Sequence, residues 1–137
     1  MSNLLEWGQQ VLATQPFSKL LDAELVEFAE GRAELHIPVS DKLKQQNGFL
    51  HGGVVAYAAD NALTYAGGSV FGGAVLTSEF KINYVRPAVG ERLIARASVL
   101  HAGKTQAVCR CEVFMVSGGE EKLCAAAQGT IVKVTAP

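Results

Sequence analysis

Hydrophobic residues at helical spacing mark two segments of the chain. In residues 4–12 apolar side chains recur every three or four positions until Pro16 stops the pattern, which predicts a short N-terminal helix. In residues 52–66 they recur again, and the pair Gly67-Gly68 marks the predicted end of a longer helix. This second segment is apolar on much of its circumference, more than a surface helix requires. We therefore expect it to lie inside the molecule.

The remaining hydrophobic pattern has the residue types of β-strands. Two short alternating runs flank Glu30-Gly31 and predict a hairpin, and residues 41–50 follow as a loop. After the second helix come four longer runs rich in Val, Ile, Thr, Phe and Tyr, separated by Pro and Gly turn signals. These predict four antiparallel strands in a meander. The predicted strands are residues 25–29, 32–38, 75–85, 91–101, 105–116 and 122–134.

The order of these elements predicts the fold class. A sheet long enough to curl could wrap the apolar helix and bury it. No linker, repeat or low-complexity segment interrupts the pattern, so residues 1–137 are predicted to form one domain. The predicted class is α+β, an antiparallel sheet wrapped around one long central helix with a short N-terminal helix.

Composition and charge limit the classes of partner that are expected. Twelve Lys and Arg against thirteen Asp and Glu give a net charge of -1, so no overall field favours nucleic acid or an anionic membrane. The chain has neither a signal-peptide pattern nor an apolar run near the roughly 20 residues that span a bilayer. We expect a cytoplasmic protein with no nucleic-acid or membrane partner.

Three cysteines lie in predicted strands, at positions 109, 111 and 124. Cys109 and Cys111 are spaced to point to the same face of one strand. A structural zinc site uses four ligands, usually at turn-based spacing. We therefore expect buried, reduced thiols and no metal site.

Candidate chemistry is concentrated where the predicted loop meets the long helix. Two glycines, Gly52 and Gly53, follow His51 at the helix start, where backbone N–H groups are unpaired and the helix dipole favours negative charge. Asp60 follows about two turns later among apolar, small or neutral residues. A carboxylate in such surroundings is costly to bury unless it is hydrogen-bonded or has a function. The pattern indicates an anion-stabilising pocket and a catalytic carboxylate.

Each of these residues also has a structural interpretation. The glycines could serve only to let the helix pack closely against the sheet. His51 could cap the helix, and Asp60 could belong to a hydrogen-bond network at an interface without reacting. We favour catalysis for Asp60 because an interior carboxylate is costly unless it is satisfied.

Several motifs together resemble one family, the hotdog-fold acyl-CoA thioesterases, in particular their phenylacetate-pathway and 4-hydroxybenzoyl-CoA thioesterase-like branch. The motifs are Gly-Phe-Leu-His-Gly-Gly at residues 48–53, the acidic residue nine positions after the histidine, Thr-Ser-Glu-Phe-Lys-Ile-Asn-Tyr at residues 77–84, and Arg86-Pro87. The resemblance extends over residues 25–134. It implies a long helix wrapped by a sheet and hydrolysis of an acyl-CoA thioester. Coenzyme A is then part of the substrate, and no other cofactor is expected.

The resemblance also implies catalytic roles. The N–H of Gly52 would hold the thioester oxygen, and Asp60 would act as general base on water or attack the carbonyl itself. The Gln45 amide would help to position the carbonyl or the water. His51 would support the same oxygen or hold the loop, and Thr77 would orient the nucleophile.

The remaining candidate residues are expected to bind substrate. Arg86 and the turn Gly103-Lys104 could meet the phosphates of coenzyme A, because a cation and free backbone donors suit anions. Ser78 could substitute for the neighbouring hydroxyl of Thr77. Residues that follow the motif or share the helix with the carboxylate are candidates for contact with the acyl group and the partner chain: Leu50, Gly53, Tyr57, Asn61, Thr64 and Tyr65.

Helix geometry predicts that one chain does not hold a complete site. Gly52 and Asp60 are eight residues apart, which is about 12 Å along a helix. A reacting carbonyl must lie about 3 Å from both its oxyanion donor and the attacking oxygen, so the carboxylate should come from a second chain. We expect at least a homodimer, with two composite sites. A homotetramer built from such dimers would also contain these sites. The preferred function is a thioesterase for aromatic or medium-chain acyl-CoA. The alternatives are a hotdog-fold dehydratase or hydratase that acts on acyl thioesters, and a non-catalytic acyl-CoA-binding protein.

Overall fold

A computed structural model describes residues 3–135 and contains helices and strands close to those that the hydrophobic pattern predicts. The predicted N-terminal helix is α1, and the long helix is α3. No described helix is long and apolar enough to cross a membrane. The elements are α1 (Leu4–Ala13), α2 (Pro16–Leu20), β1 (Glu24–Ala29), β2 (Arg32–Pro38), η1 (Asp41–Leu43), α3 (Gly52–Phe71), β3 (Val75–Tyr84), β4 (Arg92–Ala102), β5 (Gln106–Ser117) and β6 (Glu120–Lys133).

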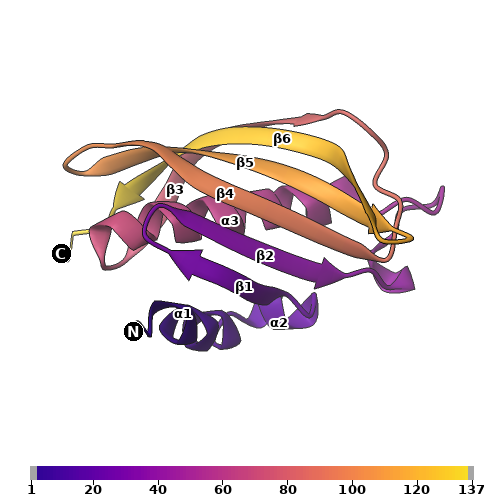
Figure 1. The fold of residues 1–137 in the computed structure, drawn as a ribbon, viewed down its shortest axis with the longest axis horizontal. Helices are drawn as coiled ribbons and strands as arrows, with labels where there is room; N and C mark the ends of the chain where they lie inside the picture. The colour runs from indigo at the N-terminus through magenta and orange to yellow at the C-terminus, as the bar shows by residue number, and fades with distance from the viewer. Residues whose placement is uncertain (1–2, 136–137) are drawn as a thin grey trace.

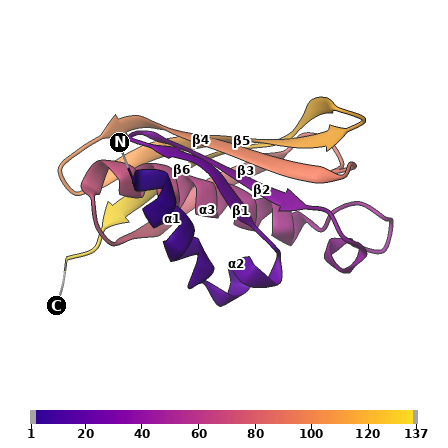
Figure 2. The same ribbon diagram turned by 60° about the horizontal axis from the view of Figure 1, so that its bottom comes forward.

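The six strands form one antiparallel sheet in the order β1-β2-β4-β5-β6-β3. The sheet curls over α3, and α1 and α2 lie beside the β1 edge (Figure 1). Turning the molecule brings the two N-terminal helices forward, with α3 between them and the sheet (Figure 2). The predicted α+β class and the sheet wrapped around one central helix are confirmed.

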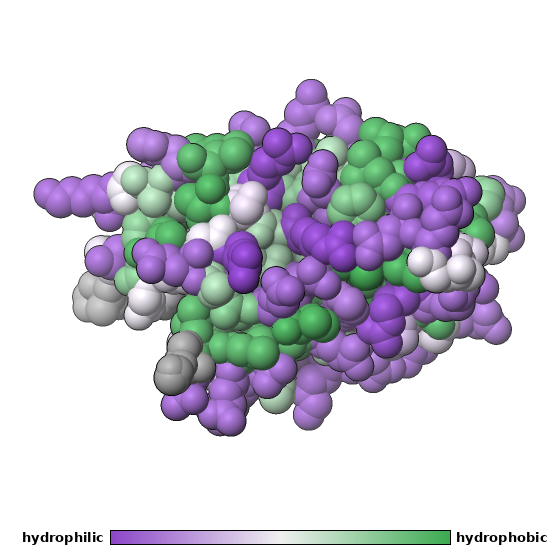
Figure 3. Space-filling view, in the orientation of Figure 1, coloured by the Kyte–Doolittle hydropathy of each residue, from purple (hydrophilic) through white to green (hydrophobic). Residues whose placement is uncertain are grey.

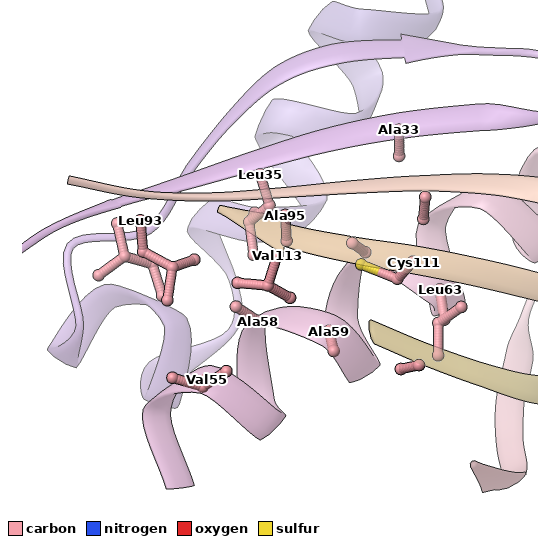
Figure 4. Packing of buried hydrophobic residues seen from close by; sticks show 14 of the residues in the cluster. Ala33, Leu35, Val55, Ala58, Ala59, Leu63, Leu93, Ala95, Cys111 and Val113 are labelled. Carbon is pink, nitrogen blue, oxygen red and sulfur yellow. The ribbon is translucent and has the colours of Figure 1, made fainter. Parts of the chain in front are cut away.

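Small side chains allow α3 to approach the sheet closely. Ala58, Ala59 and Ala62 are fully buried on the helix. Figure 4 shows α3 facing larger side chains of the sheet, among them Leu93 and Val113. Because alanine keeps the backbone near its neighbours without losing side-chain entropy, the central helix packs densely at low cost.

The long helix continues beyond its predicted end. Gly67 and Gly68 lie inside α3, which ends at Phe71 and is capped by Gly72 in the left-handed conformation. A Cβ on Gly67 would lie only 2.6 Å from the Cβ of Ile131. The glycine is therefore required by contact with β6 rather than by a helix end.

A second short helix was not predicted. Pro16 was predicted to stop the helical pattern, and it does end α1, but it also occupies the first turn of α2. Proline is well suited to this position because its missing N–H would have no partner there.

The predicted four-strand meander is wrong in one place. β4, β5 and β6 form a meander, but β3 pairs with β6 at the far edge, and β4 pairs with β2. The connection after β3 crosses the start of α3 and is held there by a hydrogen bond from Leu50 N to Ala88 O of 3.0 Å. The alternation of side chains along a strand carries no information about which strands pair. The prediction therefore placed β3 next to β4, its neighbour in the sequence.

The prediction of buried, reduced thiols is confirmed. Cys109, Cys111 and Cys124 are free and buried. Burial in an apolar environment raises the pKa of the Cys109 thiol to about 11, and burial is also the largest cause that raises the pKa of Cys111 to about 12. Among the described residues no cluster of His, Cys, Asp or Glu could hold a metal ion.

Candidate active site

The start of α3 presents an open backbone donor. His51 is the N-cap residue, and its Nδ1 accepts a hydrogen bond from Gly53 N at 2.8 Å. No partner for the Gly52 N–H occurs between residues 3 and 135. This N–H belongs to the first residue of the helix, where the helix itself supplies no acceptor. The capping role of His51 therefore leaves the neighbouring donor free to bind an oxygen.

The two glycines differ in how much room each leaves for a side chain. A Cβ on Gly53 would lie 3.0 Å from His51 Nδ1 and would press on the cap. A Cβ on Gly52 would meet only the ring of Tyr84 at 3.6 Å, which is an ordinary contact. Packing within the chain therefore does not require glycine at position 52, and an alanine there would keep the N–H.

A groove of about 400 Å³ lies next to this donor. Gln45, Leu50, Gly52 and Arg86 all line it, so the structure brings four predicted residues together. The side-chain oxygen of Gln45 accepts from Asn47 N, which holds the loop and leaves the amide NH₂ of Gln45 without a partner among the described residues. The groove thus combines a backbone donor, an amide donor and a cation.

Tyr84 and Arg86 form the far wall of the groove. The hydroxyl of Tyr84 donates to Gly52 O at 3.1 Å, so it ties the end of β3 to the helix start. Arg86 Nη1 donates to Leu123 O at 2.8 Å, and the side chain is exposed. The guanidinium is anchored at the edge of the groove with donors left for an anion.

Asp60 lies two turns along α3 and outside this groove. Its Oδ1 accepts a 2.6 Å hydrogen bond from Thr77 Oγ1 on β3. Thr64 Oγ1 donates to the backbone oxygen of Asp60 at 2.7 Å and lies 3.0 Å from Thr77 Oγ1. The carboxylate is half-buried, with one oxygen held by a hydroxyl and the other without a protein partner in the described chain.

Ser78 does not share this position. A β-bulge falls between Thr77 and Glu79, which places Ser78 outside the regular pairing with β6 and leaves it exposed. A bulge re-aims the side chains beside it. The hydroxyl that contacts the carboxylate is therefore that of Thr77, the first choice of the two predicted residues.

Two further predicted residues face the N-terminal helices. The Tyr57 hydroxyl lies 2.5 Å from Ser18 Oγ and accepts from Asn61 Nδ2 at 2.9 Å. Asn61 Nδ2 also reaches Gln15 Oε1 at 3.3 Å. Burial raises the pKa of Tyr57, against the smaller lowering by its hydrogen bonds. Sequence analysis missed Gln15 and Ser18, because nothing in their local pattern indicates a contact with α3.

Gly103 and Lys104 are not brought to either group. They form the exposed turn between β4 and β5, at the opposite end of the molecule from the start of α3 (Figure 1). They line neither the groove at Gly52 nor the surroundings of Asp60. Within one chain the predicted site residues thus form two groups, one at Gly52 and one at Asp60.

Comparison with known proteins identifies the family of the chain. Residues 47–122, more than half of the chain, match the Thioesterase superfamily. The medium/long-chain acyl-CoA thioesterase YigI of Escherichia coli is 29% identical over 127 residues, covering 77% of this chain and 79% of YigI.

Solved structures share the fold over almost the whole chain. A thioesterase family protein from Silicibacter pomeroyi is 37% identical with a TM-score of 0.85, covering 90% of this chain and 92% of that one. The PaaI protein from the phenylacetic acid degradation operon of E. coli is 26% identical with a TM-score of 0.85, covering 96% of both chains. The chain therefore belongs to the thioesterase superfamily, and it is a thioester hydrolase with the hotdog fold.

Proposed function

We propose that the protein hydrolyses acyl-CoA thioesters at two composite sites of a homodimer. The observation that carries the proposal is the division of the site: the free N–H of Gly52 and the Thr77-bound carboxylate of Asp60 lie on one helix, about 12 Å apart along its axis. Two such helices placed antiparallel about a two-fold axis bring each donor to the other chain's carboxylate. β3 is an edge strand, and edge strands offer free backbone groups to a second copy.

The chemistry follows from the two groups. The Gly52 N–H and the Gln45 amide donate to the thioester oxygen, where negative charge develops in the transition state. Asp60 of the partner subunit removes a proton from a water molecule that attacks the carbonyl carbon, or attacks that carbon itself to form a mixed anhydride that water then hydrolyses. The C–S bond breaks, and coenzyme A leaves as the thiol after its sulfur takes up a proton from Asp60 or from solvent. Thr77 holds one carboxylate oxygen so that the other faces the substrate.

The substrate is an acyl-CoA with an aromatic or medium-chain acyl group. The name of YigI gives medium and long chains for that relative, and PaaI comes from a phenylacetic acid operon. The cation Arg86 at the groove edge suits the phosphates of coenzyme A. A cytoplasmic location fits such a substrate.

A proline substitution tests the oxyanion role directly. Gly52→Pro removes the N–H at a helix position that tolerates proline, and the extended His51 before it suits a following proline. Gly52→Ala is the matched control, because it keeps the N–H and adds a Cβ in ordinary contact with Tyr84. We expect release of free thiol from acyl-CoA to fall about 10²- to 10³-fold in the proline variant and far less in the alanine variant.

Mixed dimers test the division of the site. Gly52→Pro and Asp60→Asn chains, each inactive alone, should recover about a quarter of wild-type activity when subunits are exchanged at equal amounts, because half of the dimers then hold one intact composite site. A site within one chain would give no recovery. A strictly monomeric preparation with full activity, judged by analytical ultracentrifugation, would also refute the proposal, whereas a dimer or tetramer agrees with it.

A further inference from the structure

A second cavity, of about 360 Å³, lies on the Asp60 side of α3. It is partly open to solvent and is bordered by α1, the end of β1, α3 and the start of β3. Its walls are mostly apolar, with Trp7, Val11 and Phe28 on one side and Val75 on the other. In Figure 3 a short stripe of hydrophobic side chains (green) lies low on the visible face, above a rim of hydrophilic ones (purple), in the region of β1 and α1 in Figure 1. The volume is within the range of small-molecule sites, about 300–1,000 Å³.

The polar residues of this cavity lie at its Asp60 end. Asn61 and Thr64 both line it, and they are the next residue and the next turn after Asp60. The Thr64 hydroxyl is 3.0 Å from the Thr77 hydroxyl that binds the carboxylate. Along α3 the cavity runs from Asn61 to Gly68, about 10 Å along the helix. It therefore begins beside the proposed nucleophile and runs away from it along an apolar path.

Contacts within the chain hold the walls in place. Trp7 stacks on Phe28 with ring centroids 6.4 Å apart, and Phe28 packs against the edge of Tyr65 at 5.1 Å. The Tyr65 hydroxyl donates to Gly8 O at 2.9 Å and fixes α1 to α3. Such aromatic contacts and the buried hydrogen bond give a largely preformed site.

We propose that this cavity receives the acyl group of the thioester and that Trp7 and Val11 of α1 set the largest group that fits. The inference rests on the proposed function and extends it to substrate choice. The carbonyl carbon sits at Asp60, coenzyme A extends into the Gly52 groove of the other subunit, and the acyl group extends along α3 of the subunit that supplies the carboxylate. Each methylene buried in the cavity should raise kcat/KM about fourfold until the walls at α1 are reached.

Filling the cavity tests the inference. Val11→Phe adds bulk inside the cavity, whereas Gln10→Phe adds the same side chain to the exposed face of the same helix. With acetyl-, hexanoyl- and decanoyl-CoA, we expect Val11→Phe to lower kcat/KM for the longer chains at least tenfold more than for acetyl-CoA. Gln10→Phe should follow the wild type with all three substrates. Retained acetyl-CoA activity shows that the variant is folded.

The only tryptophan of the chain provides a second measurement that does not depend on turnover. Trp7 lines the cavity, so decanoate, the product acid, should change its fluorescence emission in the wild type and in Gln10→Phe, but not in Val11→Phe.

The outcomes are distinct. Thiol release by the wild type with the same chain-length profile in Val11→Phe and Gln10→Phe overturns the inference and leaves the thioesterase proposal standing. No thiol release from any acyl-CoA by the wild type refutes the proposed function, and this inference with it.

Discussion

Thr77→Val tests whether the hydroxyl next to Asp60 supports catalysis. Valine has nearly the shape of threonine but cannot donate the 2.6 Å hydrogen bond to Asp60 Oδ1. A hydrogen bond to a charged group contributes about 1.5–3 kcal/mol. Because the carboxylate is half-buried rather than fully buried, water can partly replace the hydroxyl, and the lower half of this range applies.

The expected loss in rate follows from this energy. A loss of about 1.5–2 kcal/mol corresponds to roughly a 10- to 30-fold fall in kcat. The effect should appear in kcat more than in KM, because the hydroxyl orients the attacking group and does not touch the coenzyme. The assay is thiol release from one acyl-CoA at saturating and limiting concentrations.

Two neighbouring substitutions control this experiment. Thr77→Ser keeps the hydroxyl and should retain most of the activity. Ser78→Ala removes an exposed hydroxyl at the β-bulge and should leave kcat within about twofold. If Thr77→Val and Ser78→Ala have the same kcat, orientation of the carboxylate by Thr77 is refuted.

Three further predictions concern stability and reactivity. Gly67→Ala should lower the free energy of unfolding by about 1–3 kcal/mol in urea titrations, because its Cβ would overlap a β6 side chain. The control is Gly73→Ala, whose Cβ would meet nothing within 4 Å and which should change the free energy of unfolding far less. The three cysteines should react with a thiol reagent at pH 8 only after unfolding, since burial places their pKa values at about 11 to 12; rapid labelling of the native protein would contradict this. On β2, burial raises the pKa of Glu34, but His36 and Arg96 lower it more, so the pKa lies below 4.5. The stabilisation from the Glu34 carboxylate is therefore complete above pH 4.5 and is lost as pH falls through the lower folded pKa. Between pH 5 and pH 3, the Tm of Arg96→Ala should fall less than the Tm of the wild type. An equal fall in Tm for both proteins would contradict this prediction.

The sequence predicts those parts of the fold that depend on local period. The helix at residues 52–66 and all six strands follow from apolar spacing and lie where expected within a few residues. The position of β3 beside β6 could not be predicted, because it depends on the connection after β3 crossing the start of α3. Gly67 was misread for a related reason: contact with β6 and a helix end both favour glycine, and only the structure separates them.

The candidate site divides in the same way. The motif and helix geometry predict Gly52, Asp60 and their separation, since these depend on one helix alone. The contact between Asp60 and Thr77 joins residues 17 apart and had only the resemblance to support it. The bonds from Ser18 and Gln15 to α3 had no signal at all, because they depend on where the two N-terminal helices lie.

The N-terminal helices have a consequence for how such enzymes diversify. The stretch that matches the superfamily, residues 47–122, contains Gly52, Asp60 and Thr77 but not Trp7 or Val11. The proposed reacting groups and one wall of the second cavity therefore lie within the stretch that matches the family, whereas the opposite wall lies before it. On this proposal, changes in α1 alter which acyl groups fit and leave the proposed reacting groups in place. Substrate range can then evolve as a nearly separate module, attached to an unchanged hydrolytic unit.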